Sequence, residues 1–494
     1  MMTMNWLAIC PELVLLGMTC LIALVDLFVD DPKRTPTFVL TLMTLAAVAG
    51  IHLGYFNSGV TLYAMQNMVV SDPMGHLLGF FAALAVLVTL VYARNYAASR
   101  DLLKGEFFTL SLFVLLGISV MLSGNHFLVI YLGLELMSLS LYAMVALRRD
   151  HAPSTEAAMK YFVLGALASG FLLYGLSMLY GATGALNLQA VHHVLSSDDT
   201  INRQVLALGL VFIVAGLAFK FGVVPFHMWV PDVYQGAPTG VTLMVAGAPK
   251  LAAFAIAMRL LVEGMIPLAN DWQQMLIVLS VASMILGNLA AIAQTNLKRM
   301  LAYSAIAQLG FMLLGLTPVL ANTSVSVAAT SFGSSMFYVI TYIITTLGTF
   351  GLILFLSRPG FEAEQLSDLA GLNKRSPLLA AVMATFMFSL AGIPPTVGFY
   401  AKLVVLQSLV ATDDRTYITL AVVAVLLSLV GAFYYLRAVK IMYFDEPQDQ
   451  TALPTSGDAR FLLSVNGAAV LALGIAPGWL MSMCVYAVLR ALST

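Results

Sequence analysis

Charged residues are scarce in this sequence, and their scarcity indicates its class. Only 10% of the 494 residues are charged and 61% are hydrophobic, whereas soluble domains carry about 25% charged residues. The sequence therefore predicts a polytopic membrane protein. The formal net charge is -1, so the chain lacks the basic excess that nucleic-acid binding requires.

Cysteine is nearly absent as well. Cys10, Cys20 and Cys484 are scattered through apolar segments, without the spacing of a metal site or a disulfide framework. The sequence also lacks a cysteine cluster for iron and sulfur and a glycine-rich dinucleotide pattern. His192 and His193 stand in a polar stretch where a solvated loop is favoured over metal binding. We therefore expect no metal, cofactor or redox centre in this chain.

Polar linkers, low-complexity tracts and charge blocks are missing too, so we expect one continuous membrane domain over residues 1–494. The N-terminus, MMTMNWLAICPELVLLGMTC, lacks the basic beginning of a cleaved signal peptide. We interpret it as the start of the first membrane span.

A membrane helix needs about 20 mostly apolar residues, and fourteen segments of the sequence qualify. The expected fold is therefore all-α. The expected spans are approximately 5–28, 36–56, 74–93, 106–123, 126–147, 157–181, 204–228, 240–262, 272–294, 299–320, 326–356, 378–410, 416–443 and 460–489.

Basic residues orient these spans, because inner loops of membrane proteins are enriched in lysine and arginine. If the N-terminus lies outside, fifteen basic residues belong to the inner side: Lys33, Arg34, Arg94, Arg100, Lys104, Arg148, Arg149, Lys298, Arg299, Arg358, Lys374, Arg375, Arg437, Lys440 and Arg460. The outer side keeps four: Arg203, Arg259, Arg415 and Arg490. We therefore expect both termini on the outer side.

Four charged residues fall deep within predicted spans: Glu135, Lys220, Lys250 and Lys402. Each costs about 2.5–3.5 kcal/mol to insert, and a total of about 10–14 kcal/mol rivals the stability of a typical protein. A structural ion pair between Glu135 and one lysine remains an alternative, but it leaves the other lysines unexplained. Lysines whose proton affinity depends on a neighbouring carboxylate favour a proton relay.

Three other titratable residues have both a structural and a functional interpretation. Lys160 is near enough to a span end to reach the interface, and Glu106 stands at a helix start, where acids are common. His227, seven residues after Lys220, is either a hydrogen-bonded structural histidine or a proton-transfer group.

Two spans carry sequences that break helices. Pro225 interrupts span 7 within FGVVPF, and Gly392, Pro394 and Pro395 interrupt span 12 within SLAGIPPTVGFYAK. Irregular backbone at this depth is tolerated only inside protein or beside a wet cavity. Both breaks therefore mark candidate sites on an ion pathway.

The two breaks are five spans apart, so the broken helices run in opposite directions. This arrangement predicts two inverted five-helix repeats, spans 4–8 in residues 106–262 and spans 9–13 in residues 272–443. An N-terminal part, 1–105, and a C-terminal part, 444–494, flank them. The lysines do not align between the repeats, because Lys220 precedes its proline and Lys402 follows its pair.

The segments FKFGVVPFHMWVPDVYQGAPTGVT, QTNLKRMLAYSAIAQLGF and SLAGIPPTVGFYAKL together resemble the antiporter-like subunits of bacterial respiratory complex I, over about residues 100–440. The resemblance implies fourteen helices, two inverted repeats and proton translocation driven by quinone reduction elsewhere in the complex. It also implies FMN, iron–sulfur clusters and quinone in partner subunits, with antiporter-like and small membrane subunits as neighbours. The implied location is the bacterial inner membrane.

The resemblance also assigns residues. The proton-transfer residues it implies are Glu135, its partner Lys220, Lys250 and Lys402. The supporting or proton-uptake residues it implies are Glu106, Lys160, His227, Lys298 and Gln308. The helix breaks it implies are at Pro225, Pro394 and Pro395.

Three positions depart from the family pattern. Gln308 stands where a histidine is frequent, so a central link would use an amide and water in place of a titrating ring. Pro249 directly precedes Lys250, where a small hydroxyl residue is usual, and Gly240 replaces a proline. The last two put the helix geometry around Lys250 in question.

Two other classes of function remain as alternatives. A subunit of an Mrp-type cation/proton antiporter would share the fold and the lysines, and sodium/proton exchange without NADH would indicate it. A membrane enzyme such as a lipid-linked glycosyl transferase would need catalytic or metal-binding acids near an interface, whereas the sequence has one deep acid among lysines.

Overall fold

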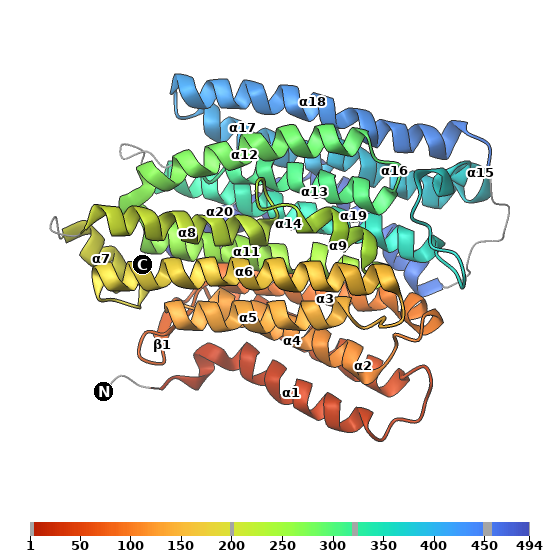
Figure 1. The fold of residues 1–494 in the computed structure, drawn as a ribbon, viewed down its shortest axis with the longest axis horizontal. Coiled ribbons are helices and arrows are strands. Elements are labelled where there is room, and N and C mark those ends of the chain that lie inside the picture. Colours follow the sequence, from red (N-terminus) through yellow and green to blue (C-terminus); the bar gives the residue numbers. More distant parts are fainter. Residues whose placement is uncertain (1–3, 198–201, 319–324, 448–456, 494) are drawn as a thin grey trace.

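The structure is a computed structural model that describes residues 4–197, 202–318, 325–447 and 457–493. Its long helices lie side by side along one direction and form a bundle (Figure 1). The first helical turn, η1 (Trp6–Ile9), and the end of the last helix, α20 (Gly478–Leu492), lie at the same end of this bundle. We call this the terminal end and the other the distal end.

Twelve helices in the described ranges are long and apolar enough to cross a membrane. They are η1–α1 (Trp6–Asp26), α2 (Thr35–Ser58), α3 (Pro73–Ser99), α4 (Gly105–Ser123), α5 (Phe127–Val145), α6 (Ala152–Thr183), α8 (Arg203–Phe221), α10–η2 (Thr239–Gly264), η3–α12 (Ile266–Ile292), α14 (Val325–Leu356), α18 (Arg415–Phe444) and α19 (Gly457–Ile475). With α13 (Leu297–Leu314) and the pair α16 (Pro377–Ala391) and α17 (Val397–Val410), they account for the predicted fourteen crossings.

Both predicted breaks are present. In the predicted span 7, 204–228, the helix α8 ends at Phe221, and residues 222–228 lead to the short helix α9 (Trp229–Gly236) beyond the predicted limit. Span 12 consists of α16 and α17, separated by residues 392–396. The prediction of broken helices 7 and 12 is therefore confirmed.

Two further interruptions were not predicted. Span 8 is divided into α10 (Thr239–Ala246), α11 (Pro249–Ala257) and a π-helical turn, η2 (Met258–Gly264). The division occurs because Gly247 has a non-helical backbone, φ -93° and ψ -112°, and Pro249 cannot continue the hydrogen bonds of α10. The last span is likewise divided, into α19 and α20.

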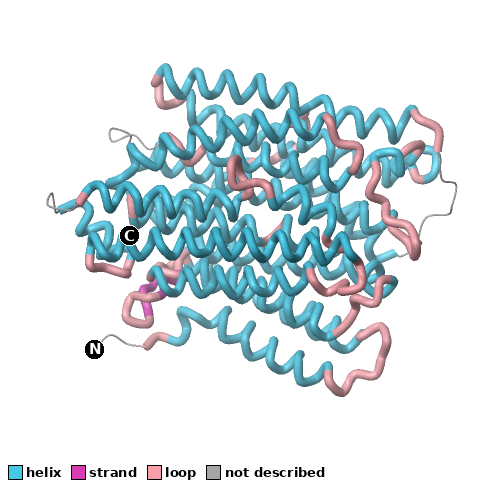
Figure 2. The backbone as a smooth tube through the Cα atoms, viewed as in Figure 1, coloured by secondary structure: helices cyan, strands magenta, loops and turns pink. Residues whose placement is uncertain are grey.

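The terminal end also contains small elements beside the long helices of the expected all-α fold. Residues between spans 2 and 3 form an antiparallel hairpin of β1 (Leu62–Ala64) and β2 (Val69–Ser71), drawn in magenta in Figure 2. The stretch with His192 and His193, predicted as a solvated loop, contains the helix α7 (Leu188–Ser197). The short elements η4 (Leu366–Leu369) and α15 (Leu372–Arg375) complete the described structure.

Burial places span 8 at the centre of the bundle. The most hydrophobic window of Thr239–Gly264 is 100% buried, compared with 22% for α18 and 28% for the first span. Arg259, predicted among the outward loop residues, is a correction: it lies in η2 and is 1% exposed. A lysine and an arginine are therefore both carried by the most enclosed span.

Candidate functional site

The break in helix 7 begins at Gly222. Its φ of 77° lies in the left-handed region that favours glycine, and the N–H groups of Gly222 and Val223 both donate to the Ala218 carbonyl. The N–H of Val224 donates to Ser283 Oγ on α12 at 2.8 Å. Because α8 ends here, the carbonyl oxygens of its last residues need partners from outside the helix.

Lys250 provides that partner. Its Nζ donates to the carbonyl oxygens of Lys220 and Phe221, both at 3.0 Å, at the negative end of the α8 dipole. The side chain is 1% exposed, and Nζ lies 5.1 Å from the centroid of the Trp229 ring. The interruption before Pro249 puts Lys250 on the first turn of α11, at the place where the departures from the family pattern left the helix geometry in question.

The break in helix 12 has the same construction. Gly392 follows the last residue of α16 with a left-handed φ of 85°. Lys402, on α17, donates to the carbonyl oxygens of Leu390 and Ala391 at 3.1 and 3.0 Å. It also donates to Ser428 Oγ on α18 at 2.7 Å, so the ammonium has an acceptor for each of its three N–H groups.

Lys250 and Lys402 are therefore geometric counterparts. In each break the lysine binds the two carbonyl oxygens directly before the glycine. The prediction that the lysines do not align is correct for Lys220 but missed Lys250 as the counterpart of Lys402. A signal was present in the sequence, because GVVP at 222–225 and GIPP at 392–395 share the glycine three residues before the proline.

Lys220 and Glu135 do not form the predicted ion pair. Lys220 Nζ donates instead to Ser138 Oγ at 2.8 Å, and Ser138 stands one helical turn after Glu135 on α5. Both side chains are among the described residues, and Oε1 of Glu135 is buried without a hydrogen-bond partner. The structure therefore holds Lys220 on the Ser138 hydroxyl, one turn from Glu135, and we call this arrangement the open form of the predicted pair.

Small cavities adjoin both capping lysines. A cavity of about 10 Å³ is lined by Lys220, Lys250 and Trp229, and one of about 20 Å³ is lined by Gln308 and Lys402. Each volume is close to what one water molecule needs. These lysines therefore have room for single waters beside them.

Gln308 connects the second lysine to two tyrosines. Its Nε2 donates to the Leu390 carbonyl at 2.8 Å and to the Tyr435 hydroxyl at 2.9 Å, and its Oε1 accepts from the Tyr338 hydroxyl. The carbonyl of Leu390 also accepts from Lys402. The amide predicted to replace a histidine is therefore joined directly to the capped helix end.

A polar pocket of about 380 Å³ opens at the distal end. Its charged and aromatic lining residues are Tyr96, Arg148, His151, Glu156, Lys160, Asp232, Arg299, Glu362 and Glu364. Lys160 pairs with Asp232 at 2.7 Å and with Glu156 at 2.8 Å, and Arg299 pairs with Asp232 at 2.8 Å. Burial alone would raise the pKa of Asp232, but the hydrogen bonds from Lys160 and Arg299 lower it below its usual value. Burial also lowers the pKa of His151.

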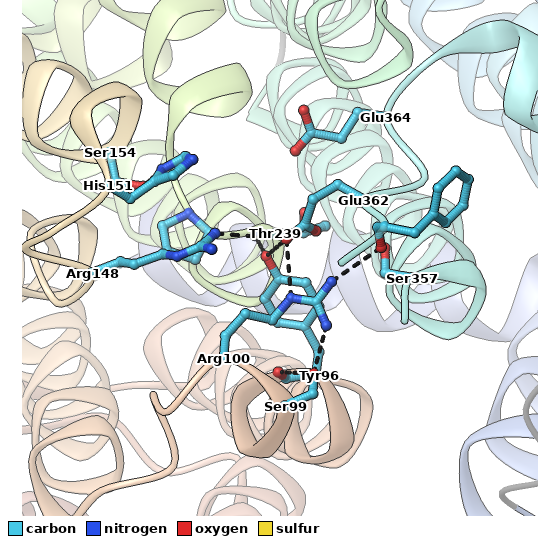
Figure 3. A network of polar contacts seen from close by, with 12 residues as sticks. Tyr96, Ser99, Arg100, Arg148, His151, Ser154, Thr239, Ser357, Glu362 and Glu364 are labelled. Atoms are coloured by element: carbon cyan, nitrogen blue, oxygen red, sulfur yellow. Dashed lines mark hydrogen bonds and ion pairs between the residues drawn. The ribbon is translucent and has the colours of Figure 1, made fainter. Parts of the chain in front are cut away.

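The loop after α14 supplies two carboxylates to this pocket (Figure 3). Glu362 accepts from Arg100 Nε at 3.0 Å and lies 3.7 Å from Arg148 Nη1. Glu364 pairs at 2.8 Å with Lys298, which is 1% exposed. The pocket thus brings together two predicted supporting residues, Lys160 on its wall and Lys298 behind it.

The other three predicted supporting residues lie elsewhere, Gln308 beside Lys402 as described above. Glu106, on the first turn of α4, lines a surface cavity of about 570 Å³ with Arg148. His227 lies in the break of helix 7 and is partly buried, and its Nδ1 has no partner among the described residues. Its neighbours Pro225 and Met228 are exposed, Met228 to 65%. The break therefore reaches the surface of the bundle.

Some residues of the site were missed in the sequence. Ser138 could have been found, because it follows Glu135 by three residues and shares its helix face. No sequence pattern pointed to the other three missed residues, because their partners are distant in the sequence; these residues are Ser428, Asp232 and Glu364. Within the described ranges, no cluster of histidine, cysteine and acidic side chains has the arrangement of a metal site.

The fold and these caps define a class: a helical membrane bundle with two broken helices, each closed by a buried lysine. Residues 124–428 match the family described as "NADH:quinone oxidoreductase/Mrp antiporter, TM". The chain belongs to this family, and the expected antiporter-like fold is confirmed.

Relatives that match nearly the whole chain are more specific than the family model. The chain is 61% identical to NADH-quinone oxidoreductase subunit N of Polaromonas naphthalenivorans over 97% of both sequences. It matches a chain of respiratory complex I from Thermus thermophilus with 32% identity and a TM-score of 0.80, over 96% of this chain and 98% of that one. A chain of the Mrp complex from a Dietzia species shares the fold, with a TM-score of 0.82 at 20% identity over 98% of both chains.

Proposed function

We propose that this chain is a proton-translocating membrane-arm subunit of NADH-quinone oxidoreductase. The supporting observation is the pair of lysine caps, Lys250 and Lys402, in a chain 61% identical to such a subunit. An ammonium buried at a helix end is favoured by the carbonyls it binds and disfavoured by its apolar surroundings. A modest change in nearby charge is therefore enough to load or empty it.

In the proposed cycle, Lys220 moves between two partners on α5. With Lys220 at the Ser138 hydroxyl, its positive charge opposes protonation of Lys250. When Lys220 moves to the Glu135 carboxylate, that repulsion weakens and the Lys250 amine takes up a proton at Nζ. The return movement restores the repulsion, and Lys250 releases the proton to a water in the small cavity beside it.

We infer that the polar chain around Gln308 carries the proton into the second repeat. An amide does not take up a proton at neutral pH, so the carriers are water and the Tyr338 and Tyr435 hydroxyls that the amide holds. Lys402 then serves as the second loading site. The role of the predicted residues Glu106, Lys160, His227 and Lys298 is proton uptake, for which the charged distal pocket around Lys160 is the suited location.

The driving energy comes from partner subunits, which hold FMN, iron–sulfur clusters and quinone in this proposal. Exposed residues at the two breaks support such partners: the break after α8 exposes Pro225 and Met228, and the break between α16 and α17 exposes Pro394 and Pro395. Irregular backbone is not tolerated against lipid. Neighbouring antiporter-like and small membrane subunits therefore cover these breaks.

We place the chain in the bacterial inner membrane with both termini outside, because the predicted inner loops carry most of the lysine and arginine. The distal pocket then faces the cytoplasm. The Mrp-type antiporter remains the alternative, and the 61% identity to an oxidoreductase subunit, against 20% to an Mrp chain, favours the first proposal.

The test is to replace Glu135 with Gln and, separately, Lys220 with Met in the assembled complex. Proton uptake by inside-out vesicles is measured with NADH oxidation in the same preparation. Each variant should lose protons pumped per NADH, whereas Glu446→Gln, at a carboxylate 82% exposed, should not. Full pumping by both site variants would disprove the proposal, and sodium/proton exchange without NADH would favour the alternative.

A further inference from the structure

A second buried polar cluster lies at the terminal end, far from the distal pocket. We call it the Arg259 cluster; its members are His52 on α2, Ser71 on β2, Asp72 and His76 at the start of α3, and Arg259 and Glu263 in η2. Five of the six are less than 9% exposed, and Glu263 is 17% exposed at its side chain. The proposed cycle uses none of them.

The charged part of the cluster has one negative charge in excess. Arg259 binds Asp72 through two hydrogen bonds, at 2.7 and 2.9 Å, and binds Glu263 at 2.7 Å. It also donates to the Leu122 carbonyl at 3.0 Å. Two carboxylates therefore face one guanidinium in a buried site, where an unbalanced charge is costly.

A pair of imidazoles adjoins this charge through its inner member, His76. His52 Nδ1 is 3.1 Å from His76 Nδ1, and His76 Nε2 is 2.7 Å from Ser71 Oγ. His76 interacts electrostatically with Asp72 and Arg259. The other titratable groups around the pair are Tyr55, whose ring stacks on His76 at 5.0 Å, and beyond it Glu12 and Cys10.

The contacts fix the tautomers when both rings are neutral. Only one of the two facing Nδ1 atoms carries a hydrogen. If His52 Nδ1–H donates to His76, then His76 donates Nε2–H to Ser71, and His52 Nε2 is a bare acceptor. His52 Nε2 is in fact buried without a partner among the described residues. The opposite choice would bury an unbonded N–H, which costs more than a bare lone pair on this ring.

Span 8 joins this cluster to the proposed site. Its first residue, Thr239, donates its N–H to the Tyr96 hydroxyl, which lines the distal pocket. Lys250 stands in the middle, and Arg259 follows nine residues later, about 13 Å along a helix. Ala253 and Ile256, which follow Lys250 on α11, also line the small cavity beside it.

We propose that the His52–His76 pair is a proton-release station at the terminal end of span 8. This inference rests on the proposed function. A proton arriving at His52 Nε2 makes an imidazolium that balances the excess negative charge of the Arg259 triad. His52 then passes its Nδ1 proton to His76 Nδ1, and His76 passes its Nε2 proton to Ser71 Oγ as the hydroxyl proton leaves to water. Each step makes one N–H or O–H bond and breaks one.

The experiment uses the intact complex in inside-out vesicles and compares protons pumped per NADH across several pH values. His52→Gln keeps a hydrogen-bonding side chain toward His76 but removes the titrating ring, and Glu263→Gln removes the excess charge. Both should lose protons pumped per NADH while NADH oxidation with an uncoupler is retained. The control is His193→Gln, at an exposed histidine on α7, which should pump normally.

The outcomes are distinguishable from failure of the proposed function. If Glu135→Gln loses pumping while His52→Gln and Glu263→Gln pump like the unmodified complex at every pH, the release station is wrong and the central site stands. If the complex with His52→Gln does not assemble, the Glu263→Gln variant alone tests the proposal. The Glu263 side chain lies at the edge of the cluster, so its replacement disturbs the packing less. Normal pumping by that variant then overturns the proposal.

Discussion

Gln308 and Lys402 share one acceptor, the carbonyl oxygen of Leu390. The Gln308 Nε2 lies 2.8 Å and the Lys402 Nζ lies 3.1 Å from that oxygen. A change in the charge or position of the lysine therefore acts directly on the amide, which also binds the hydroxyls of Tyr338 and Tyr435. A continuous polar connection thus joins α17 to α13, α14 and α18.

Replacing Gln308 with Ala should destabilise the chain and reduce pumping. The buried Tyr338 hydroxyl would lose the acceptor that it binds, and an unsatisfied buried polar group costs about 1–3 kcal/mol. The Tyr435 hydroxyl would lose one partner but keep Ser304. Gln308→His should retain pumping, because the ring can still donate and accept. Thermal unfolding and protons pumped per NADH check this prediction, and an Ala variant normal in both measurements would contradict it.

Replacing Ser138 with Ala should disturb the proposed switch with little effect on the fold. Without the hydroxyl, Lys220 has only Glu135 as a polar partner on α5, so the open form seen here is disfavoured and pumping slows. Ser140→Ala is the matched control: Ser140 is buried on the same helix and bonds only the Leu136 carbonyl. Equal pumping rates in the two variants would count against a role for Ser138.

Replacing Gly222 or Gly392 with Ala should damage the break that contains the replaced glycine. Each glycine has a left-handed φ, which costs other residues about 1–2 kcal/mol. An added Cβ would also lie 2.5 Å from Val230 Cγ2 in the first break and 2.9 Å from Lys402 Cδ in the second. Gly184→Ala separates the two effects, because Gly184 has φ 67° and open space around it. We expect the control to lose stability only modestly and to pump normally, measured by thermal unfolding and vesicle assays.

The sequence predicted the parts of the fold that depend on local chemistry. Apolar length located the fourteen crossings, and Pro225 and Pro394 located the breaks, because a proline affects its own helix. It could not show which carbonyls Lys250 and Lys402 bind, since those contacts depend on how separate helices pack. The resemblance predicted the Glu135–Lys220 pair. In the structure the Lys220 ammonium does not bind Glu135, because the Ser138 hydroxyl offers it a neutral acceptor at the same depth.

Replacing Asp232 with Asn should remove a pH-dependent contribution to stability. Its pKa is lowered in the folded chain because the hydrogen bonds from Lys160 and Arg299 outweigh burial. The stabilisation is therefore present above the ordinary carboxyl pKa of about 3.9 and is lost as the pH falls through the lower folded value. Thermal unfolding of the detergent-solubilised complex should show the variant as less stable at pH 7. A difference that persisted unchanged at the lowest pH would contradict this assignment.

Replacing His151 with Gln should act in a different pH window. Burial, with the neighbouring Arg148, lowers the pKa of His151 despite the opposing Glu362 and Glu364, so the folded chain favours the neutral ring. Stability is then fully present above the unfolded pKa of about 6.5 and falls as the pH drops below it, because the unfolded chain binds the proton first. The variant should lose less stability than the unmodified chain between about pH 6.5 and 5. Parallel unfolding curves for both proteins across that window would show that His151 does not titrate on unfolding.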